Sequence, residues 1–228
     1  MFNVIKLLQF APPLSAAQRT QLARLLQASL NGLLEAEDVL LQPTLPGVYN
    51  GGDYLWHLRF PDEAAYRQTL ADGRWRRGVD DVLADRDRIA AVDSVAYPAG
   101  RRGGKSPGQG VYRVLLLSTE RVGRPASSPS AGTLARFEDE LCAMPDYIAS
   151  IRRWQLSRVT DAAGARGWTH VWEQEYADLQ GLQGPYMMHP YHWGFIDRWF
   201  DPENPDWIVD PHLCHTFCAL DRALIAPR

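Results

Sequence analysis

The chain has 228 residues, a formal net charge of −3 and 46% hydrophobic residues, values that are ordinary for a globular protein of one large or two small domains. This charge gives no electrostatic reason to expect binding to nucleic acid or to an anionic membrane. No apolar segment reaches the roughly 20 residues that a membrane-spanning helix needs. The N-terminus has no signal-type pattern, and three cysteines are too few for a disulfide framework, so we expect a reduced, cytoplasmic protein.

The first part of the chain alternates between strand and helix patterns. Strand patterns occur at residues 2–10, 39–42, 53–60 and 89–97. A helix is expected from the Ser15/Gln18 capping box to about residue 34, and a second over 61–86 with a weak point at Asp72-Gly73. The order β-α-β-β-α-β is that of a ferredoxin-like unit, which we assign to residues 1–98.

The same order repeats in the second part. Residues 99–110 are rich in glycine and polar residues and are interpreted as a linker. Strand patterns follow at 111–118, 151–159, 169–176 and 213–220. A polar segment over 120–130 is expected to be a loop, and helices are expected from Ser130 or Thr133 and over 180–200. Residues 111–228 therefore form a second ferredoxin-like unit.

A single unit of this type leaves one face of its sheet bare, so two units can bury these faces against each other. The predicted fold is an α+β protein in which tandem ferredoxin-like units close into a barrel within one chain. We expect the barrel interior to be the pocket. Tyr54 and Trp56 share one face of their strand and are assigned to its wall, whereas His57 points the other way, toward helices or solvent.

The most distinctive segment runs from Gly184 to Phe195 and combines a phenol with two imidazoles. Pro190 is tolerated in the first turn of a helix, where the missing N–H has no partner to lose. His189 and His192 are three residues apart and share a helical face. Imidazoles titrate near neutral pH, which suits them to proton transfer.

The spacing Tyr186-x-x-His189-Pro190-x-His192-x-x-Phe195, with the pair Thr169-His170, resembles the dimeric α+β barrel family in its stress-responsive A/B barrel branch. This branch includes the plant enzyme olivetolic acid cyclase, and the similarity extends over about residues 111–222. The resemblance implies Tyr186 and His192 as catalytic acid and base, with His170 in the pocket. Arg113 stands where the family has a further pocket histidine, and the first unit lacks the motif at residues 70–76.

Further residues are assigned to substrate binding or to packing. The substrate-binding set comprises Tyr54, Trp56, Arg113, Trp172, His189 and Phe195. Tyr186, His189 and His192 could instead be packed core residues, a structural role is open for His170, and a surface or interface position is equally open for Arg113. Cys214 and Cys218, which alternate with His215, are assigned to the core. A metal site with His212 is disfavoured, because the strand spacing places the two cysteines about 13 Å apart. We predict no metal and no cofactor.

The function that these residues favour is a cofactor-independent lyase or cyclase. It would act by aldol or retro-aldol chemistry on an aromatic or polyketide-like small molecule. Two alternatives stay open: a non-catalytic stress-response or ligand-binding barrel, and a cofactor-free monooxygenase of phenolic substrates. The expected partner is a small molecule, without nucleic acid or membrane, and a homodimer is one allowed assembly.

Overall fold

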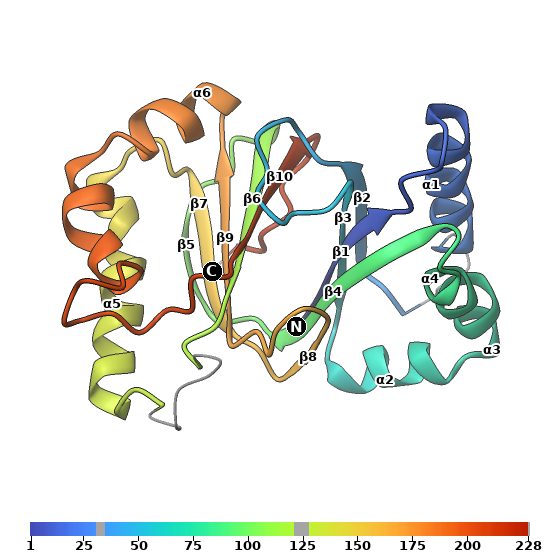
Figure 1. Ribbon diagram of the computed structural model, residues 1–228, viewed down its shortest axis with the longest axis horizontal. Coiled ribbons are helices and arrows are strands. Elements are labelled where there is room, and N and C mark those ends of the chain that lie inside the picture. The colour runs from blue at the N-terminus through green and yellow to red at the C-terminus, as the bar shows by residue number, and fades with distance from the viewer. Residues whose placement is uncertain (31–34, 121–127, 228) are drawn as a thin grey trace.

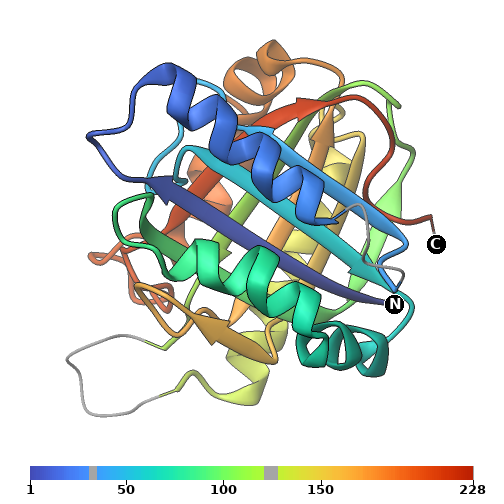
Figure 2. The same cartoon turned by 90° about the vertical axis from the view of Figure 1, so that its right-hand side faces the viewer.

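Two antiparallel sheets face each other in the computed structural model, and the helices cover their outer faces (Figure 1). The structure describes residues 1–30, 35–120 and 128–227. Figure 2 shows the helices of the first unit lying across their own sheet, with the second sheet behind it. None of the helices in these ranges has the length and apolar character to cross a bilayer.

The first sheet has the strand order β2-β3-β1-β4-β8. Its elements in chain order are β1 (Phe2–Phe10), α1 (Ala16–Leu30), β2 (Asp38–Pro43), β3 (Tyr54–Phe60), α2 (Glu63–Ala71), α3 (Gly73–Trp75), η1 (Arg76–Asp80), α4 (Asp81–Ala84) and β4 (Ile89–Pro98). The capping box is confirmed, because the Gln18 amide donates to Ser15 Oγ at 3.3 Å and the Ser15 amide donates to Gln18 Oε1 at 2.9 Å. The weak point is also present: Asp72 ends α2 in an extended conformation and caps α3.

The second sheet has the order β10-β6-β9-β7-β5. Its unit contains β5 (Arg101–Gly104), β6 (Gly110–Leu117), α5 (Ala131–Tyr147), β7 (Arg153–Arg158), β8 (Asp161–Ala163), β9 (His170–Tyr176), α6 (Leu179–Gly181), η2 (Leu182–Tyr186), η3 (His192–Ile196), η4 (Asp197–Trp199) and β10 (Cys214–Leu220). Without β8 and β5, the two sheets have the same order of four strands. Tandem ferredoxin-like units therefore form the barrel within one chain, as predicted.

The two units exchange small strands, which the sequence did not indicate. The segment predicted as a linker contains β5, which pairs with β7 of the second sheet. In return β8, from a turn of the second unit, pairs with β4 of the first sheet. Two bridges, Thr44 to Cys218 and Tyr49 to His215, join the loop after β2 to β10. The predicted end of the helix near residue 34 and residues 121–127 of the predicted loop lie outside the described residues.

The space between the sheets is filled by side chains. Its apolar residues include Ile5, Leu7, Leu55, Val95, Tyr97, Tyr112, Val114, Leu116, Val171, Cys214 and Cys218. A polar group lies among them, in which Glu173 accepts hydrogen bonds from Tyr112 at 2.6 Å and Gln155 at 2.7 Å. The expectation that this interior is the pocket is therefore wrong, because the two facing layers of large side chains meet.

The assignment of the two faces of β3 is also corrected. Tyr54 stacks on Phe10 and Trp56 on Trp75, under the helices of the first unit. His57 points between the sheets, 2% exposed, with Nε2 3.3 Å from Asn3 Oδ1. Alternation separates the two faces of a strand, but both faces of this strand are buried, so hydrophobicity could not show which one meets the helices.

Candidate active site

A cavity of about 500 Å³ lies between the second sheet and the helical segments that cover it. Its floor is formed by β6, β9 and β10, its walls by α5 and the segments from η2 to the residues after η4, and part of its rim by the loop after β2. The lining residues are Tyr49, Arg113, Leu115, Leu141, Trp172, Tyr186, Met187, His192, Ile196, Asp197, Phe200, Asp201, Leu213 and His215. Four of the nine residues predicted for the site are among them: Arg113, Trp172, Tyr186 and His192.

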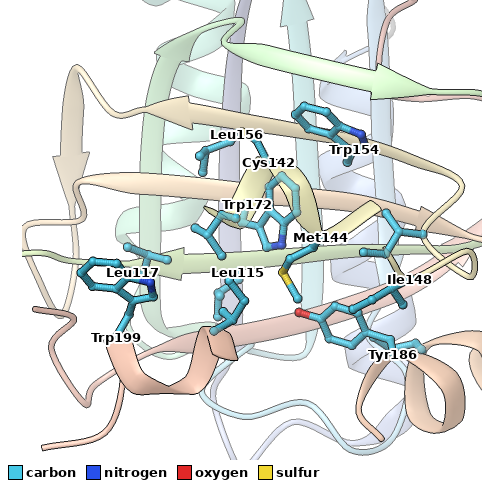
Figure 3. Packing of buried hydrophobic residues seen from close by; sticks show 14 of the residues in the cluster. Leu115, Leu117, Cys142, Met144, Ile148, Trp154, Leu156, Trp172, Tyr186 and Trp199 are labelled. Atoms are coloured by element: carbon cyan, nitrogen blue, oxygen red, sulfur yellow. The ribbon is translucent and has the colours of Figure 1, made fainter. Parts of the chain in front are cut away.

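Tyr186 ends η2 and is 2% exposed. Its hydroxyl oxygen accepts a hydrogen bond from Arg113 Nη1 at 3.2 Å, and Figure 3 shows this oxygen pointing inward, toward Leu115. Burial raises the pKa of Tyr186, and the nearby Arg113 charge opposes this rise only in part. The phenol therefore stays protonated at neutral pH, and its own hydrogen is available to a ligand.

His192 lies next to Tyr186. A helix begins at Pro190, as predicted, and continues into the π-helical turn η3, which starts at His192. The two rings meet edge to face with centroids 4.6 Å apart. Burial, with a smaller contribution from the Arg113 charge, lowers the pKa of His192 to about 4. Asp197 Oδ1 is 3.7 Å from His192 Nδ1, too far for a hydrogen bond, so the imidazole is neutral and able to accept a proton.

Arg113 lies in the floor of the cavity on β6 and is 4% exposed. Its Nη1 donates to Gln174 Oε1 and to Tyr186, and its guanidinium lies 5.2 Å from the centroid of the Tyr186 ring. Trp172, on the neighbouring strand β9, packs against Trp154 and forms an apolar part of the same floor. Figure 3 shows Trp172 between Leu115 and Trp154.

Sequence reasoning did not assign the other ten lining residues to the site, and two of them, His215 and Tyr49, come from β10 and from the first unit. His215 on β10 faces the cavity, and burial lowers its pKa to about 3, with further contributions from Arg113 and His192. Tyr49 comes from the first unit and is 57% exposed at the rim. His215 alternates with Cys214 and Cys218 in β10, so it lies on the opposite face from the two cysteines. No local pattern predicts the bridge that brings Tyr49 beside it.

The other predicted residues lie outside this cavity. His170 Nε2 is 3.0 Å from Glu138 Oε1 and its Nδ1 is 2.8 Å from Thr169 Oγ1, so both ring nitrogens are already engaged. His189 Nδ1 accepts a hydrogen bond from the Tyr191 amide at 3.1 Å, next to the start of the helix. Phe195 packs against Tyr191 and under Arg198. Tyr54 and Trp56 lie in the other unit, because their face of β3 meets its helices.

Comparison with known proteins agrees with the fold. Residues 127–210 match the stress responsive A/B barrel domain. Among curated proteins, none matches the sequence at a significant level. The crystal structure of an anthrone oxidase-like protein is similar over 96% of this chain and 90% of that one, with a TM-score of 0.68 and 8% identity.

Two further crystal structures, each of a candidate monooxygenase, are also similar over nearly the whole chain. The protein from Fusobacterium nucleatum gives a TM-score of 0.57 at 7% identity, covering 100% of this chain and 97% of that one. The protein from Lactobacillus acidophilus gives 0.54 at 11% identity, covering 99% and 98%. At such identities the likeness concerns the fold alone.

Proposed function

We propose that this chain, whose second half carries a domain of the stress-responsive A/B barrel family, is a cofactor-independent acid–base enzyme. Its substrate is a small aromatic or polyketide-like molecule that bears a carbonyl group. The observation that carries the proposal is the contact between Tyr186 and His192 in one cavity, with the phenol protonated and the imidazole neutral. A matched acid and base are what proton transfer at carbon requires.

The roles follow from these protonation states. His192 removes a proton from the carbon next to the carbonyl group. Tyr186 donates its hydrogen to the carbonyl oxygen as this oxygen becomes an enolate. Arg113 donates to the phenol oxygen, which makes the phenol a stronger donor at the moment when negative charge develops. The enolate then attacks a second carbonyl carbon in an aldol cyclisation, or forms by the reverse cleavage in a lyase.

A monooxygenase is the second candidate, and the structural likeness to an anthrone oxidase-like protein favours it. Such an enzyme uses the same first step. The carbanion left by His192 would react with dioxygen, so that a CH₂ group and O₂ give a C=O group and H₂O. The acid–base pair therefore serves both candidates, and the fate of the carbanion separates them.

The test uses a model substrate, 2-tetralone, a cyclic ketone fused to a benzene ring, of a size that suits the cavity. In D₂O, NMR measures the loss of its α-hydrogen signals in the presence of the protein. We expect exchange faster than the buffer rate. Oxygen uptake with anthrone, followed on an electrode, would indicate the monooxygenase. Binding without exchange or oxygen uptake would instead support the ligand-binding alternative.

A further inference from the structure

Arg113 carries a buried positive charge that the proposed acid–base chemistry does not explain. Its side chain is 4% exposed and its guanidinium is charged at any relevant pH. A buried charge is costly unless an opposite charge or a full set of hydrogen bonds compensates it. Within the described ranges, no carboxylate forms an ion pair with Arg113. Its only hydrogen-bond partners there are the neutral Gln174 and Tyr186.

The two hydrogen bonds occupy one corner of the guanidinium group. Both start from Nη1. Nε is buried and has no partner. Among the described residues, Nη2 forms no hydrogen bond, because both hydrogen bonds of Arg113 start from Nη1. Nε–H and Nη2–H form the side edge of the guanidinium, which has the spacing to donate two parallel hydrogen bonds to one carboxylate. The free part of Arg113 is thus the part suited to bidentate recognition.

Other groups around the cavity agree with an acceptor-rich ligand. His192 Nδ1 and His215 Nε2 are buried without partners, and each can be a donor when the tautomer places its hydrogen there. Two carboxylates, of Asp197 and Asp201, also line the cavity, but they belong to the segment that covers it. Their residues are more exposed than Arg113, which lies in the floor. The strongest permanent charge deep in the cavity is therefore positive.

We propose that the ligand of this cavity carries a carboxylate group, and that the Nε/Nη2 edge of Arg113 binds it. The ligand supplies the counter-charge that the chain itself does not provide. This deepens the proposed function, and it rests on that function only in taking the cavity as the substrate site. In a substrate bound in this way, the aromatic or polyketide-like part extends toward Trp172 and Leu115, with its reacting carbon near His192.

The test compares two probes of nearly equal shape, 2-naphthoate and 2-naphthamide, by isothermal titration calorimetry at pH 7.5. The wild-type protein should bind the carboxylate at least about tenfold more tightly, because hydrogen bonds between charged groups are stronger than those of a neutral amide. Arg113→Met should remove this preference and leave the affinity for the amide within about threefold. Arg113→Lys keeps the charge but lacks the two parallel N–H donors of the guanidinium edge, so it should retain only part of the preference.

Three controls make the outcome specific. Arg101→Met makes the same chemical change on β5 of the same sheet, away from the cavity, and should keep the full preference. Melting curves establish that each variant is folded. His192→Ala should lose exchange on 2-tetralone and should still bind the carboxylate more tightly than the amide, because Arg113 is intact.

Each outcome decides the proposal. Equal affinities in the wild-type protein, failure of both probes to bind, or a preference that survives in Arg113→Met would overturn it. Exchange activity without a carboxylate preference would leave the acid–base proposal standing and overturn this one. A carboxylate preference without exchange activity would support this proposal and overturn the acid–base proposal.

Discussion

Each unit has a cationic side chain at a comparable position of the same fold, but the two cations differ in type and in surroundings. Lys6 on β1 and Arg113 on β6 each lie on the helix-facing side of equivalent strands, two residues before a leucine on the same face. Lys6 donates to Ser94 at 2.9 Å, and burial lowers its pKa, opposed by the charges of Asp80 and Asp161. A lysine can give up its proton under such conditions, whereas an arginine cannot.

The surroundings differ as much as the cations. Across from Lys6, β3 supplies Trp56, which stacks on Trp75 and fills the space beneath the helices. Across from Arg113, β9 supplies the smaller Gln174, and the space above the sheet stays open as the cavity. Two units with one topology thus give a packed core in one case and a pocket in the other. The difference lies in the few side chains that face the helices.

The largest expected effect concerns the acid–base pair, which only the second unit has. His192→Ala should slow exchange on 2-tetralone by about 10² to 10⁴-fold, the usual contribution of a general base. Because the pKa of His192 is lowered to about 4, wild-type kcat/KM should be flat near neutral pH and fall as the pH drops through about 4. Asp72→Ala, at the corresponding helical break of the first unit, should change the rate less than twofold. An unchanged rate in folded His192→Ala would assign His192 to packing.

The next effect concerns His57, at the boundary between the two units. Burial lowers its pKa to about 3, so the folded state keeps it neutral while the unfolded chain binds a proton below about pH 6.5. Its contribution to stability is therefore lost as the pH falls from 6.5 toward 3. Between pH 7 and 4.5, the wild-type protein should lose roughly 2–3 kcal/mol more free energy of unfolding than His57→Gln.

Urea denaturation at the two pH values measures this difference. Glu173, whose pKa burial raises to about 7, changes stability in the opposite direction over the same range. It is present in both proteins, so its contribution cancels when they are compared. Identical pH dependence in the two proteins would show that His57 is not held neutral between the sheets.

The third prediction compares the packed core of the first unit with the cavity of the second unit, by one substitution in each. Leu8 is fully enclosed, so Leu8→Phe should overpack the first unit and cost about 1–3 kcal/mol in urea denaturation. Leu115 lines the cavity, so Leu115→Phe should cost less and instead weaken binding of 2-naphthoate. Equal losses of stability at both positions, with binding intact in Leu115→Phe, would contradict the difference between the units.

Sequence reasoning gave the topology because strand alternation, the Ser15 capping box and the break at Asp72 are local signals. It also indicated Tyr186 and His192, through the resemblance of the segment from Tyr186 to Phe195 to a known family. It failed where contacts between distant parts of the chain determine the surroundings of a side chain. Three features depend on which layer each strand meets. These are the face of β3 that meets the helices, the partners of His170, and the approach of Tyr49 to His215. The strands β5 and β8 are too short for a pattern and exist because a neighbouring edge pairs with them.

The measurement that tests the central claim most directly is a crystal structure of the protein with 6-bromo-2-naphthoate, in which anomalous scattering locates the bromine. The account predicts one bound molecule in the second unit, between β6, β9 and the segments η2 and η3. Its carboxylate should lie on the Nε/Nη2 edge of Arg113 and its ring beside Tyr186 and His192. A molecule found between the two sheets near His57, or beneath the helices of the first unit, would contradict it.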